Sequence, residues 1–500
     1  MTSRRVVGNP ATTEPRSGRQ RALVPVLVSL GMLVAVVSSL GAPLVPTIAA
    51  EEHVSLNDAQ WSLTVTLLVG AVVTPVMGRL GDGPCRRPVI LGALVAVLAG
   101  CVLAALPLGF GFLVTGRALQ GLGLCLTPLA IATARDALPP ERSRPAVALL
   151  SITTVAGVGL GYPLTGLIAQ SFGLYAGFWF GAAVSVAALV AAVVVLPPSP
   201  RRAAPRMDVA GAALLGAGLA GLLLALSEAE LWGWNSARLL VLVGVCVLLL
   251  AVWVVHELRT AQPLVDLRLT RDRTVLTANV TALVAGLGMY LLLSLVTRFV
   301  QTPREAGYGF GASVAVTGLV LLPFSLASMA AGRMVPLLIR RAGTALVLPL
   351  GCVVSLAAVL AFALVRGQLW ELFAIMAVAG FGIGWMFAVM PGMIVGSVPA
   401  HETGSAMSFN QVLRYVGYST GSVLSATVLQ AHTVAGSVLP TGDGYRTAAL
   451  LACGVWVAMI LVTAVLPPRH RRGAVAATVP GPAPAPRTEG EDAARQKAVR

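Results

Sequence analysis

Residues 78–87 read Gly-Arg-Leu-Gly-Asp-Gly-Pro-Cys-Arg-Arg and separate two apolar runs, at about 60–80 and 88–107. Each run has the roughly 20 residues that a helix needs to cross the hydrocarbon core of a bilayer. The short turn holds three arginines, and loops on the cytoplasmic side of a membrane carry an excess of Lys and Arg. The segment therefore predicts a helical hairpin that crosses a membrane, with its turn in the cytoplasm.

The composition extends this interpretation to the whole chain. Of its 500 residues, 57% are hydrophobic and 11% are charged, whereas soluble domains are about 25% charged. Segments inside hydrocarbon must satisfy their own backbone groups, and the apolar runs show no strand-like alternation, so we expect helices. The sequence predicts an all-α membrane protein of fourteen transmembrane helices, and it excludes a soluble enzyme, a secreted domain and a nucleic-acid binder. The predicted spans lie at about 24–46, 60–80, 88–107, 110–133, 146–169, 173–196, 209–227, 237–256, 274–298, 312–333, 345–365, 370–395, 406–429 and 447–466.

The basic residues give an orientation for these spans. With the N-terminus inside, 28 of the 35 Lys and Arg residues fall on the cytoplasmic side and five on the outer side. This bias predicts a multi-pass protein of the cell membrane with both termini cytoplasmic, and it explains the net charge of +15 without a nucleic-acid partner. We interpret residues 1–23 as a cytoplasmic tail, the first apolar run as an uncleaved helix, and residues 467–500 as a disordered tail.

An internal repeat divides the chain. At an offset of 254 residues the first turn matches a later one, and an offset of 260 relates two further segments. The repeat predicts two pseudo-symmetric six-helix bundles, at 24–196 and 274–466, with an inserted two-helix segment at 197–273. Such duplication is typical of transporters with a binding site between the halves. The matched residues are Gly78, Arg79, Arg86 and Arg87 with Gly332, Arg333, Arg340 and Arg341, then Leu138-Pro139, Gly157 and Gly161 with Val398-Pro399, Gly417 and Gly421.

Three motifs within this repeat resemble those of the major facilitator superfamily, and specifically its fourteen-span drug:proton antiporter family. The first turn carries Gly78, Leu80, Asp82, Arg86 and Arg87 of the superfamily's cytoplasmic motif, with Cys85 where a glycine is usual. The other two are Arg117-Ala-Leu-Gln120-Gly-Leu-Gly123 in the fourth span, and Gly157 to Gly166 in the fifth, which has Tyr162 before Pro163. Two segments, Leu231-Trp-Gly-Trp234 and Pro263-Leu-Val-Asp-Leu-Arg268, add to the likeness. The resemblance implies export of small amphipathic molecules, drugs among them, by proton antiport.

Asp82 is the candidate gating residue of the first turn. Its carboxylate can pair with an arginine or cap the N-terminus of a neighbouring helix. A contact of either kind between the halves would exist in one conformation only and would act as a latch. The alternative is a solvated loop acid that balances the nearby arginines. The repeat places Pro336 at the equivalent position, so the carboxylate belongs to one half alone.

Small residues recur every four positions in the fifth span and in its repeat. Gly157 and Gly161 share one helix face, Gly417 and Gly421 share another, and Pro163 and Gly166 complete the motif. Faces of this kind let transmembrane helices approach closely. Packing alone explains the pattern, and sliding between two states is a compatible functional interpretation.

Arg117 and Arg414 lie inside predicted spans, with Gln120 and Asn410 on the same faces. A charge at the bilayer centre costs at least about 2.5–3.5 kcal/mol on insertion scales, so such residues usually face the protein interior or water. They are candidates for a substrate or proton pathway, and snorkelling from a helix end is the alternative. Further candidates, each equally explained by packing, are Asn279, Tyr290, Trp385, Met386, Met390, Tyr415 and Tyr418.

The remaining residues limit the chemistry. The five histidines and six cysteines lack ligand spacing, so we expect no metal and no cofactor, and no nucleophile–base pair or ATP-binding loop marks an enzyme. The expected partners are a small-molecule substrate, protons and the bilayer, with the protein acting as a monomer. Export of an endogenous metabolite remains an alternative, as does a non-transporting membrane sensor or enzyme. None of the twenty acids reaches the middle of a span, which favours neutral, zwitterionic or anionic substrates. Proton coupling would then use Asp82, Asp136, Glu371 or the substrate.

Overall fold

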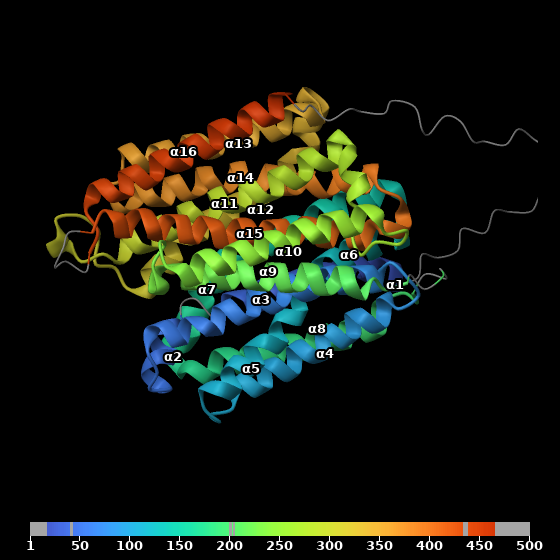
Figure 1. The fold of residues 1–500 in the computed structure, drawn as a ribbon, viewed down its shortest axis with the longest axis horizontal. Coiled ribbons are helices and arrows are strands. Elements are labelled where there is room, and N and C mark those ends of the chain that lie inside the picture. Colours follow the sequence, from blue (N-terminus) through green and yellow to red (C-terminus); the bar gives the residue numbers. More distant parts are fainter. Residues whose placement is uncertain (1–17, 41–43, 200–202, 204–205, 434–438, 466–500) are drawn as a thin grey trace, which may run out of the picture. The chain divides into compact units, whose positions relative to one another are not determined.

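The computed structural model of the chain describes residues 18–40, 44–199, 203, 206–433 and 439–465. The predicted tail at 467–500 and most of that at 1–23 lie outside these residues. The described part is helical, and its one β-bridge joins Thr433 and Pro440. The expectation of an all-α membrane protein is confirmed for this part of the chain (Figure 1).

The helices follow one another with short connections. Their bounds are α1 Gly18–Ser39, α2 Val45–Glu51, α3 Leu56–Gly81, α4 Arg86–Ala105, α5 Phe110–Gly121, η2 Leu122–Cys125, α6 Leu126–Ala137, α7 Pro140–Phe172, α8 Leu174–Val195, α9 Val209–Trp232, α10 Ala237–Arg259, η3 Leu267–Arg271, α11 Arg273–Gln301, η4 Arg304–Ala306, α12 Val314–Ala342, α13 Thr344–Leu364, α14 Leu369–Ser397, η5 Ala400–Glu402, α15 Thr403–Ala431 and α16 Gly442–Val465.

Eleven helical segments of the described residues are long and apolar enough to cross a membrane. Helices α1, α7 and α15 occupy the other three predicted positions without meeting the same criteria. Helix α15 carries Asn410, Gln411 and Arg414, which lower its hydropathy but are buried against other helices rather than exposed to lipid. The finding is a multi-pass membrane protein, while the count of fourteen spans stays a prediction.

Glycine lets two pairs of helices follow one another without a loop. Gly173 lies between α7 and α8 with φ of +86°, and Gly343 lies between α12 and α13 with φ of +77°. Only glycine adopts this region at little cost, so the chain reverses within one residue. These tight turns keep the helices antiparallel and leave little chain outside the bundle.

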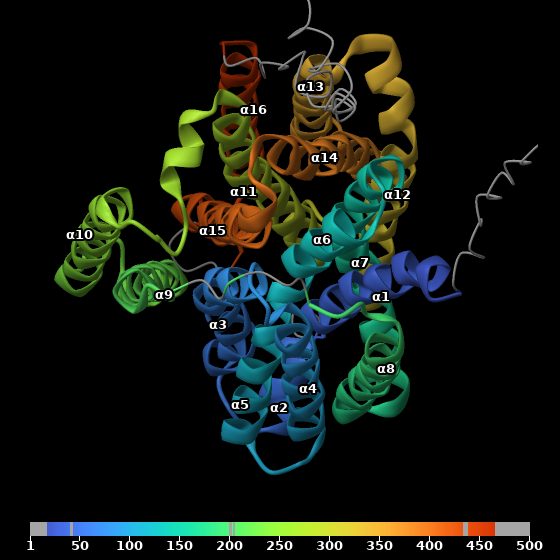
Figure 2. The same ribbon diagram turned by 90° about the vertical axis from the view of Figure 1, so that its right-hand side faces the viewer.

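Contacts between helices define how the halves meet. Helix α3 of the first half packs against α15 of the second, and α12 of the second packs against α7 of the first. The inserted helix α9 packs against α3 and α15, and α10 packs on α9 (Figure 2). Helix α10 is therefore mostly exposed, whereas α9 belongs to the wall of the bundle.

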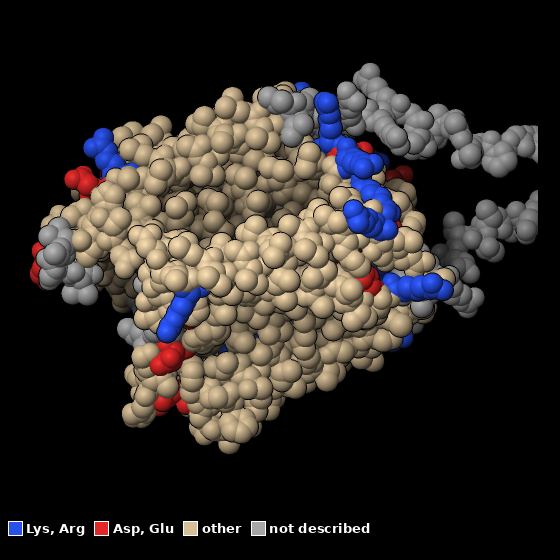
Figure 3. Space-filling view, in the orientation of Figure 1, with Lys and Arg blue, Asp and Glu red and all other residues tan. Residues whose placement is uncertain are grey.

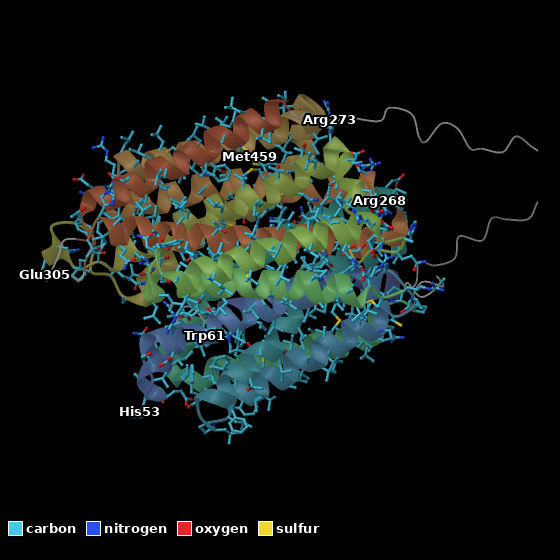
Figure 4. All side chains as sticks on the ribbon, in the orientation of Figure 1. His53, Trp61, Arg268, Arg273, Glu305 and Met459 are labelled. Atoms are coloured by element: carbon cyan, nitrogen blue, oxygen red, sulfur yellow. The ribbon has the colours of Figure 1, made fainter. Side chains whose placement is uncertain are left out.

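Charged residues collect at the ends of the helices. Most of the visible Lys and Arg lie at the right-hand end of the view in Figure 3, where Arg268 and Arg273 are labelled in Figure 4. His53 and Glu305 lie at the opposite end (Figure 4). The visible basic residues are thus more numerous at one end of the helices than at the other (Figure 3).

Candidate functional site

A cavity of about 460 Å³ lies between the two halves. Helices α3, α5, α9, α11, α12 and α15 line it, so the inserted segment contributes a wall through Leu223, Leu226 and Ser227. Hydroxyl and amide groups dominate its polar surface, and its charged lining residues among those described are two arginines, without Asp or Glu. The polar lining residues are Gln60, Thr64, Thr66, Arg117, Ser227, Tyr290, Ser294, Thr297, Arg298, Gln301, Thr317, Tyr418, Ser419 and Ser422.

Arg117 is the deepest charged group of this lining and is fully buried. Its Nε donates to the carbonyl of Ser62, and its Nη1 donates to the carbonyl of Val37 and, at 2.6 Å, to Gln120 Oε1. The Nη2 has no partner among the described residues. Three hydrogen bonds hold the guanidinium between α1, α3 and α5, and the N–H groups of Nη2 are left free to bind a ligand.

Two tyrosines face each other in the cavity. The rings of Tyr290 and Tyr418 stack with centroids 4.3 Å apart. They come from α11 and α15, which pack more extensively than any other pair of helices. Both residues were cavity candidates in the sequence, and both line the cavity.

The other sequence candidates lie outside this lining. Gln120 supports Arg117 from behind, and Asn410 donates to Asn279 Oδ1 at 3.0 Å. The ring of Trp385 packs against that of Phe381, with the ring centroids 6.2 Å apart. Arg414 is buried, with its Cζ 4.5 Å from the centroid of the Phe387 ring. The structure therefore brings only Arg117 of the six named pathway residues into the cavity.

Asp82 caps the N-terminus of a helix in the other half. Its Oδ1 accepts from the backbone N–H of Gly404 at 2.6 Å, and its Oδ2 accepts from that of Ser405 at 2.8 Å. These residues begin α15, where free N–H groups and the helix dipole favour a negative charge. The sequence analysis considered an arginine or a helix N-terminus as the partner of this carboxylate, and in the structure the partner is a helix N-terminus.

Glycine permits this close approach. A Cβ on Gly78 would lie 2.8 Å from the carbonyl oxygen of Gly404, and a Cβ on Gly404 would lie 2.7 Å from that of Gly78. The backbones of α3 and α15 thus touch one turn before the cap. Any larger side chain at either position would separate Asp82 from α15.

Burial raises the pKa of the Asp82 carboxyl from 3.8 to about 6, because the loss of hydration outweighs the two backbone donors and the charge of Arg86, which lower it. Asp82 lies just beyond the end of α3. A carboxyl that is buried in one conformation and hydrated in another changes proton affinity between them. The cap is therefore sensitive to pH near neutrality.

The arginines of the same motif stay within the first half. Arg86 donates to Asp136 Oδ2 and to the carbonyl of Gly81, each at 2.7 Å, which joins α4 to α6 and to the end of α3. Arg87 donates to the carbonyl of Val193 at 2.8 Å. Leu80 is partly buried in α3. These residues hold the turn so that Asp82 reaches α15.

Arg135 is a cross-half contact that the sequence did not single out. Its Nη2 donates to the carbonyl of Val398 at 2.9 Å, and its Nη1 donates to the carbonyl of Pro399 and to Thr403 Oγ1. These carbonyls end α14, where a cation is favoured by the helix dipole. In the sequence Arg135 is one of many loop arginines, and no local signal separates it from the rest.

The small residues of α7 and α15 sit at close helix crossings. A Cβ on Gly157 would meet the Cβ of Ala35 at 2.0 Å, and a Cβ on Gly421 would meet the carbonyl oxygen of Leu287 at 2.2 Å. Gly417 makes the same approach to Leu283, Gly161 is buried, and Pro163 packs on Gly318 of α12. Gly166 differs, because a Cβ there would meet nothing within 4 Å.

The comparisons with known proteins agree with this architecture. The family model of the Major Facilitator Superfamily matches residues 27–254, 207–422 and 279–497. The chain is 28% identical over 481 residues to the tetracenomycin C resistance and export protein of Streptomyces glaucescens, covering 91% of this chain and 86% of that protein. It is 27% identical over 376 residues to a multidrug resistance protein B homolog of Mycobacterium tuberculosis (strain ATCC 25618 / H37Rv), covering 74% and 68%.

A solved structure shares the fold. The human organic anion transporter MFSD10 (TETRAN) superposes with a TM-score of 0.63 at 17% identity, covering 89% of this chain and 99% of that one. The family match, the relatives and the shared fold together define a membrane transporter rather than an enzyme. The chain belongs to the major facilitator superfamily, as the sequence motifs predicted, and relatives of it are named as drug export and multidrug resistance proteins. It is a multi-pass membrane protein that transports small molecules.

Proposed function

We propose that this protein exports small amphipathic molecules by alternating access, in exchange for protons. The observation that carries the proposal is the position of the cap relative to the cavity. Asp82 closes the end where α3 finishes and α15 begins, whereas the cavity is lined by the first half of α3 and the last half of α15. We call the bonds of Asp82 to α15 and of Arg135 to the end of α14 the latch. The described conformation is then closed at the latch end and open toward the other.

The proposed topology has fourteen spans with both termini in the cytoplasm. It places the latch on the cytoplasmic side and the cavity toward the outside, as an exporter that has just released its substrate requires. Its support is that eleven described segments can cross a membrane and that α1, α7 and α15 lie at the other predicted positions, while Arg79, Arg86 and Arg87 lie at the same helix ends as Asp82. The domains are two six-helix bundles at 24–196 and 274–466, joined by the inserted pair at 197–273, and the unit is a monomer.

The proposed substrates are neutral, zwitterionic or anionic amphiphiles. Arg117 and Arg298 give the described cavity lining two positive charges and no balancing acid. A positive charge acts strongly on a ligand in surroundings of low dielectric constant. The stacked tyrosines and the hydroxyl groups supply an aromatic surface and hydrogen-bond partners for the rest of the molecule.

Proton coupling is proposed to run through the latch. The described lining has no carboxylate to carry a proton, while Asp82 is buried in the described conformation and would become hydrated when the latch opens. Asp136, Glu371 and an ionisable substrate are the other carriers considered. Asp136 already bonds to Arg86, and Glu371 caps the start of α14 at the opposite end.

A substrate panel in inside-out vesicles tests the proposal. Vesicles with the purified protein would be offered fluorescent organic anions, zwitterions and cations, with and without an imposed pH gradient. Gradient-dependent accumulation of anions or zwitterions is expected. Absence of accumulation for the whole panel would contradict export, and accumulation independent of the gradient would contradict proton exchange alone.

A further inference from the structure

One face of α15 joins the latch to the cavity. Ser405, Ser408, Gln411, Tyr415, Tyr418 and Ser422 follow at spacings of three or four residues and so share a helix face. Ser405 binds Asp82, and Tyr418 and Ser422 line the cavity. With a rise of 1.5 Å per residue, roughly 20 Å of buried helix separates Ser405 from Tyr418. The middle of this face is closed in the described conformation.

Buried donors without acceptors collect in that closed segment. Arg414 Nε has no hydrogen-bond partner among the described residues, and Gln411 Nε2 and Tyr415 Oη have none outside this group of three. All three side chains belong to residues that are 2–4% exposed. Buried polar groups are normally paired, because an unpaired donor costs about 1–3 kcal/mol. An unpaired guanidinium N–H, beside two buried polar groups that can bond only to each other, therefore calls for an explanation.

The charge of Arg414 is also uncompensated. Its Nη2 donates to Gln411 Oε1 at 2.6 Å, and the face of its guanidinium lies on Phe387. No described Asp or Glu forms an ion pair with it. A cation–π contact satisfies the face of a guanidinium but leaves the N–H groups at its edge free. A purely structural role would thus provide neither a counter-charge for Arg414 nor acceptors for its free N–H groups.

We propose that Arg414, Gln411 and Tyr415 form a second anion-binding site, which receives the acidic group of an amphipathic organic acid from the cytoplasmic side. The site becomes accessible when the latch opens, and closure passes the acidic group toward Arg117 in the cavity. Guanidinium N–H groups suit a carboxylate or sulfonate in an enclosed site. This inference rests on the proposed function, because it assigns the inner end of the same pathway.

Charge-selective labelling of Ser408 tests the site without any transport. Ser408 is fully buried and packs against Gly78, and it lies about 9 Å along the helix from Arg414. The variant is Ser408→Cys in a chain whose native cysteines are replaced by alanine. Inside-out vesicles would be treated with methanethiosulfonates that carry a sulfonate or a trimethylammonium group. Asp82→Ala serves to open the latch, because alanine offers α15 no acceptor.

With Asp82→Ala, the cysteine at position 408 should react. When each labelling rate is divided by the rate of the same reagent with a free thiol, the sulfonate reagent should be at least about 10-fold faster than the ammonium reagent. Arg414→Gln should abolish that preference, and Arg414→Lys should restore it. Arg340→Gln is the matched control, since Arg340 is an exposed arginine at the same end, and it should leave the preference unchanged. No reaction at position 408, or a preference that survives Arg414→Gln, would overturn the site. If the labelling behaves as expected but vesicles accumulate no organic anion, the proposed substrate class fails and the site stands.

Discussion

At the scale of single residues, Asp82 balances two opposing effects. The N-terminus of α15 stabilises its negative charge, and burial penalises that charge by a larger amount, so its pKa rises to about 6. A conformation in which a group has a raised pKa is favoured at low pH and loses that advantage as pH rises through the raised value. The population of the latched state, relative to the unlatched state, should therefore increase as the pH falls from 7 to 5.

Asp82→Asn should slow transport about 10-fold or more, because the amide resembles the protonated acid and keeps the latch closed. The rise of the pKa from 3.8 to about 6 corresponds to a change of roughly 100-fold in the equilibrium between latched and unlatched states, and this sets the upper limit of the effect. The variant should also lose the dependence of the rate on cytoplasmic pH between 5 and 7. Initial rates in proteoliposomes at a series of internal and external pH values measure both effects. A fully active variant with an unchanged pH profile would remove Asp82 from the gating mechanism.

Arg135→Gln should weaken the latch from its other side. The substitution removes charge-assisted bonds to Val398 and Pro399, which hold the end of α14 against α6. A net loss on the order of 1 kcal/mol for bonds in a partly exposed site should lower the ratio of latched to unlatched protein roughly 5-fold. Limited proteolysis or labelling of the latch end reports that fraction. The matched control is the exposed Arg142→Gln, and equal effects of the two variants would show a non-specific role of charge.

The sequence could predict residues whose local pattern is unusual and could not predict those whose partners are distant. Asp82 stands in a recognisable motif, and Arg117 is a charge within an apolar span. The role of Arg135 depends on carbonyls 263 residues further along the chain. Arg414 was found by the same signal as Arg117, yet only the packing of α14 and α15 places it outside the cavity.

At the scale of helices, the small residues decide which pairs approach. Gly157 lets α7 meet α1, and Gly421 lets α15 meet α11. The contact at Gly421 is with a backbone carbonyl, which cannot move aside as a side chain can. Spacing in the sequence predicted these faces, but it did not show that Gly166 of the same motif meets open space.

Gly157→Leu and Gly421→Leu should each abolish transport, because the added side chain separates backbones that touch. Gly166→Leu should retain at least about half of the activity, since nothing opposes its Cβ and surface substitutions usually change stability by less than 0.5 kcal/mol. Transport per molecule of membrane-inserted protein, with thermal unfolding in detergent, separates lost motion from lost folding. Normal export by both leucine variants would place these faces against lipid.

The positions of the inserted helices α9 and α10 could be predicted from the sequence, but their packing could not. The predicted spans at 209–227 and 237–256 coincide with α9 and α10, which the sequence analysis described as an insertion between two bundles. It contained no sign that Leu223 and Ser227 of α9 line the cavity, because that depends on α9 packing beside α3. The first predicted span also divides, since α1 ends at Ser39 and α2 begins at Val45.

At the scale of the whole molecule, the distribution of charge sets the selectivity. Every described acid lies away from the lining of the cavity, whereas Arg117 and Arg298 contribute to it. The absence of acids from the predicted span centres was visible in the sequence. The arrangement of the arginines required the fold, because only the structure shows that Arg298, in the last turn of α11, lines the same cavity as Arg117.

Arg117→Ala should lower the export of an organic anion at least about 10-fold while leaving a neutral analogue within about 2-fold, because an enclosed charge is worth more than 1.4 kcal/mol to its counter-ion. The measurement is accumulation of the matched pair of compounds in inside-out vesicles. Arg238→Gln, an exposed arginine at the start of α10, is the control. Strong efflux of lipophilic cations that survives Arg117→Ala would show that the cavity charge does not set the selectivity.

The distance across the latch tests the central claim most directly. Spin labels on the exposed Cys85 and on His401→Cys, with the other cysteines replaced, would report from both sides of the contact between Asp82 and α15. In lipid nanodiscs at pH 5 we predict one short distance, and with Asp82→Ala a longer one. At pH 7.5 the wild-type residue should give both distances, in proportions that substrate changes. A single distance that neither pH, substrate nor Asp82→Ala alters would contradict the account.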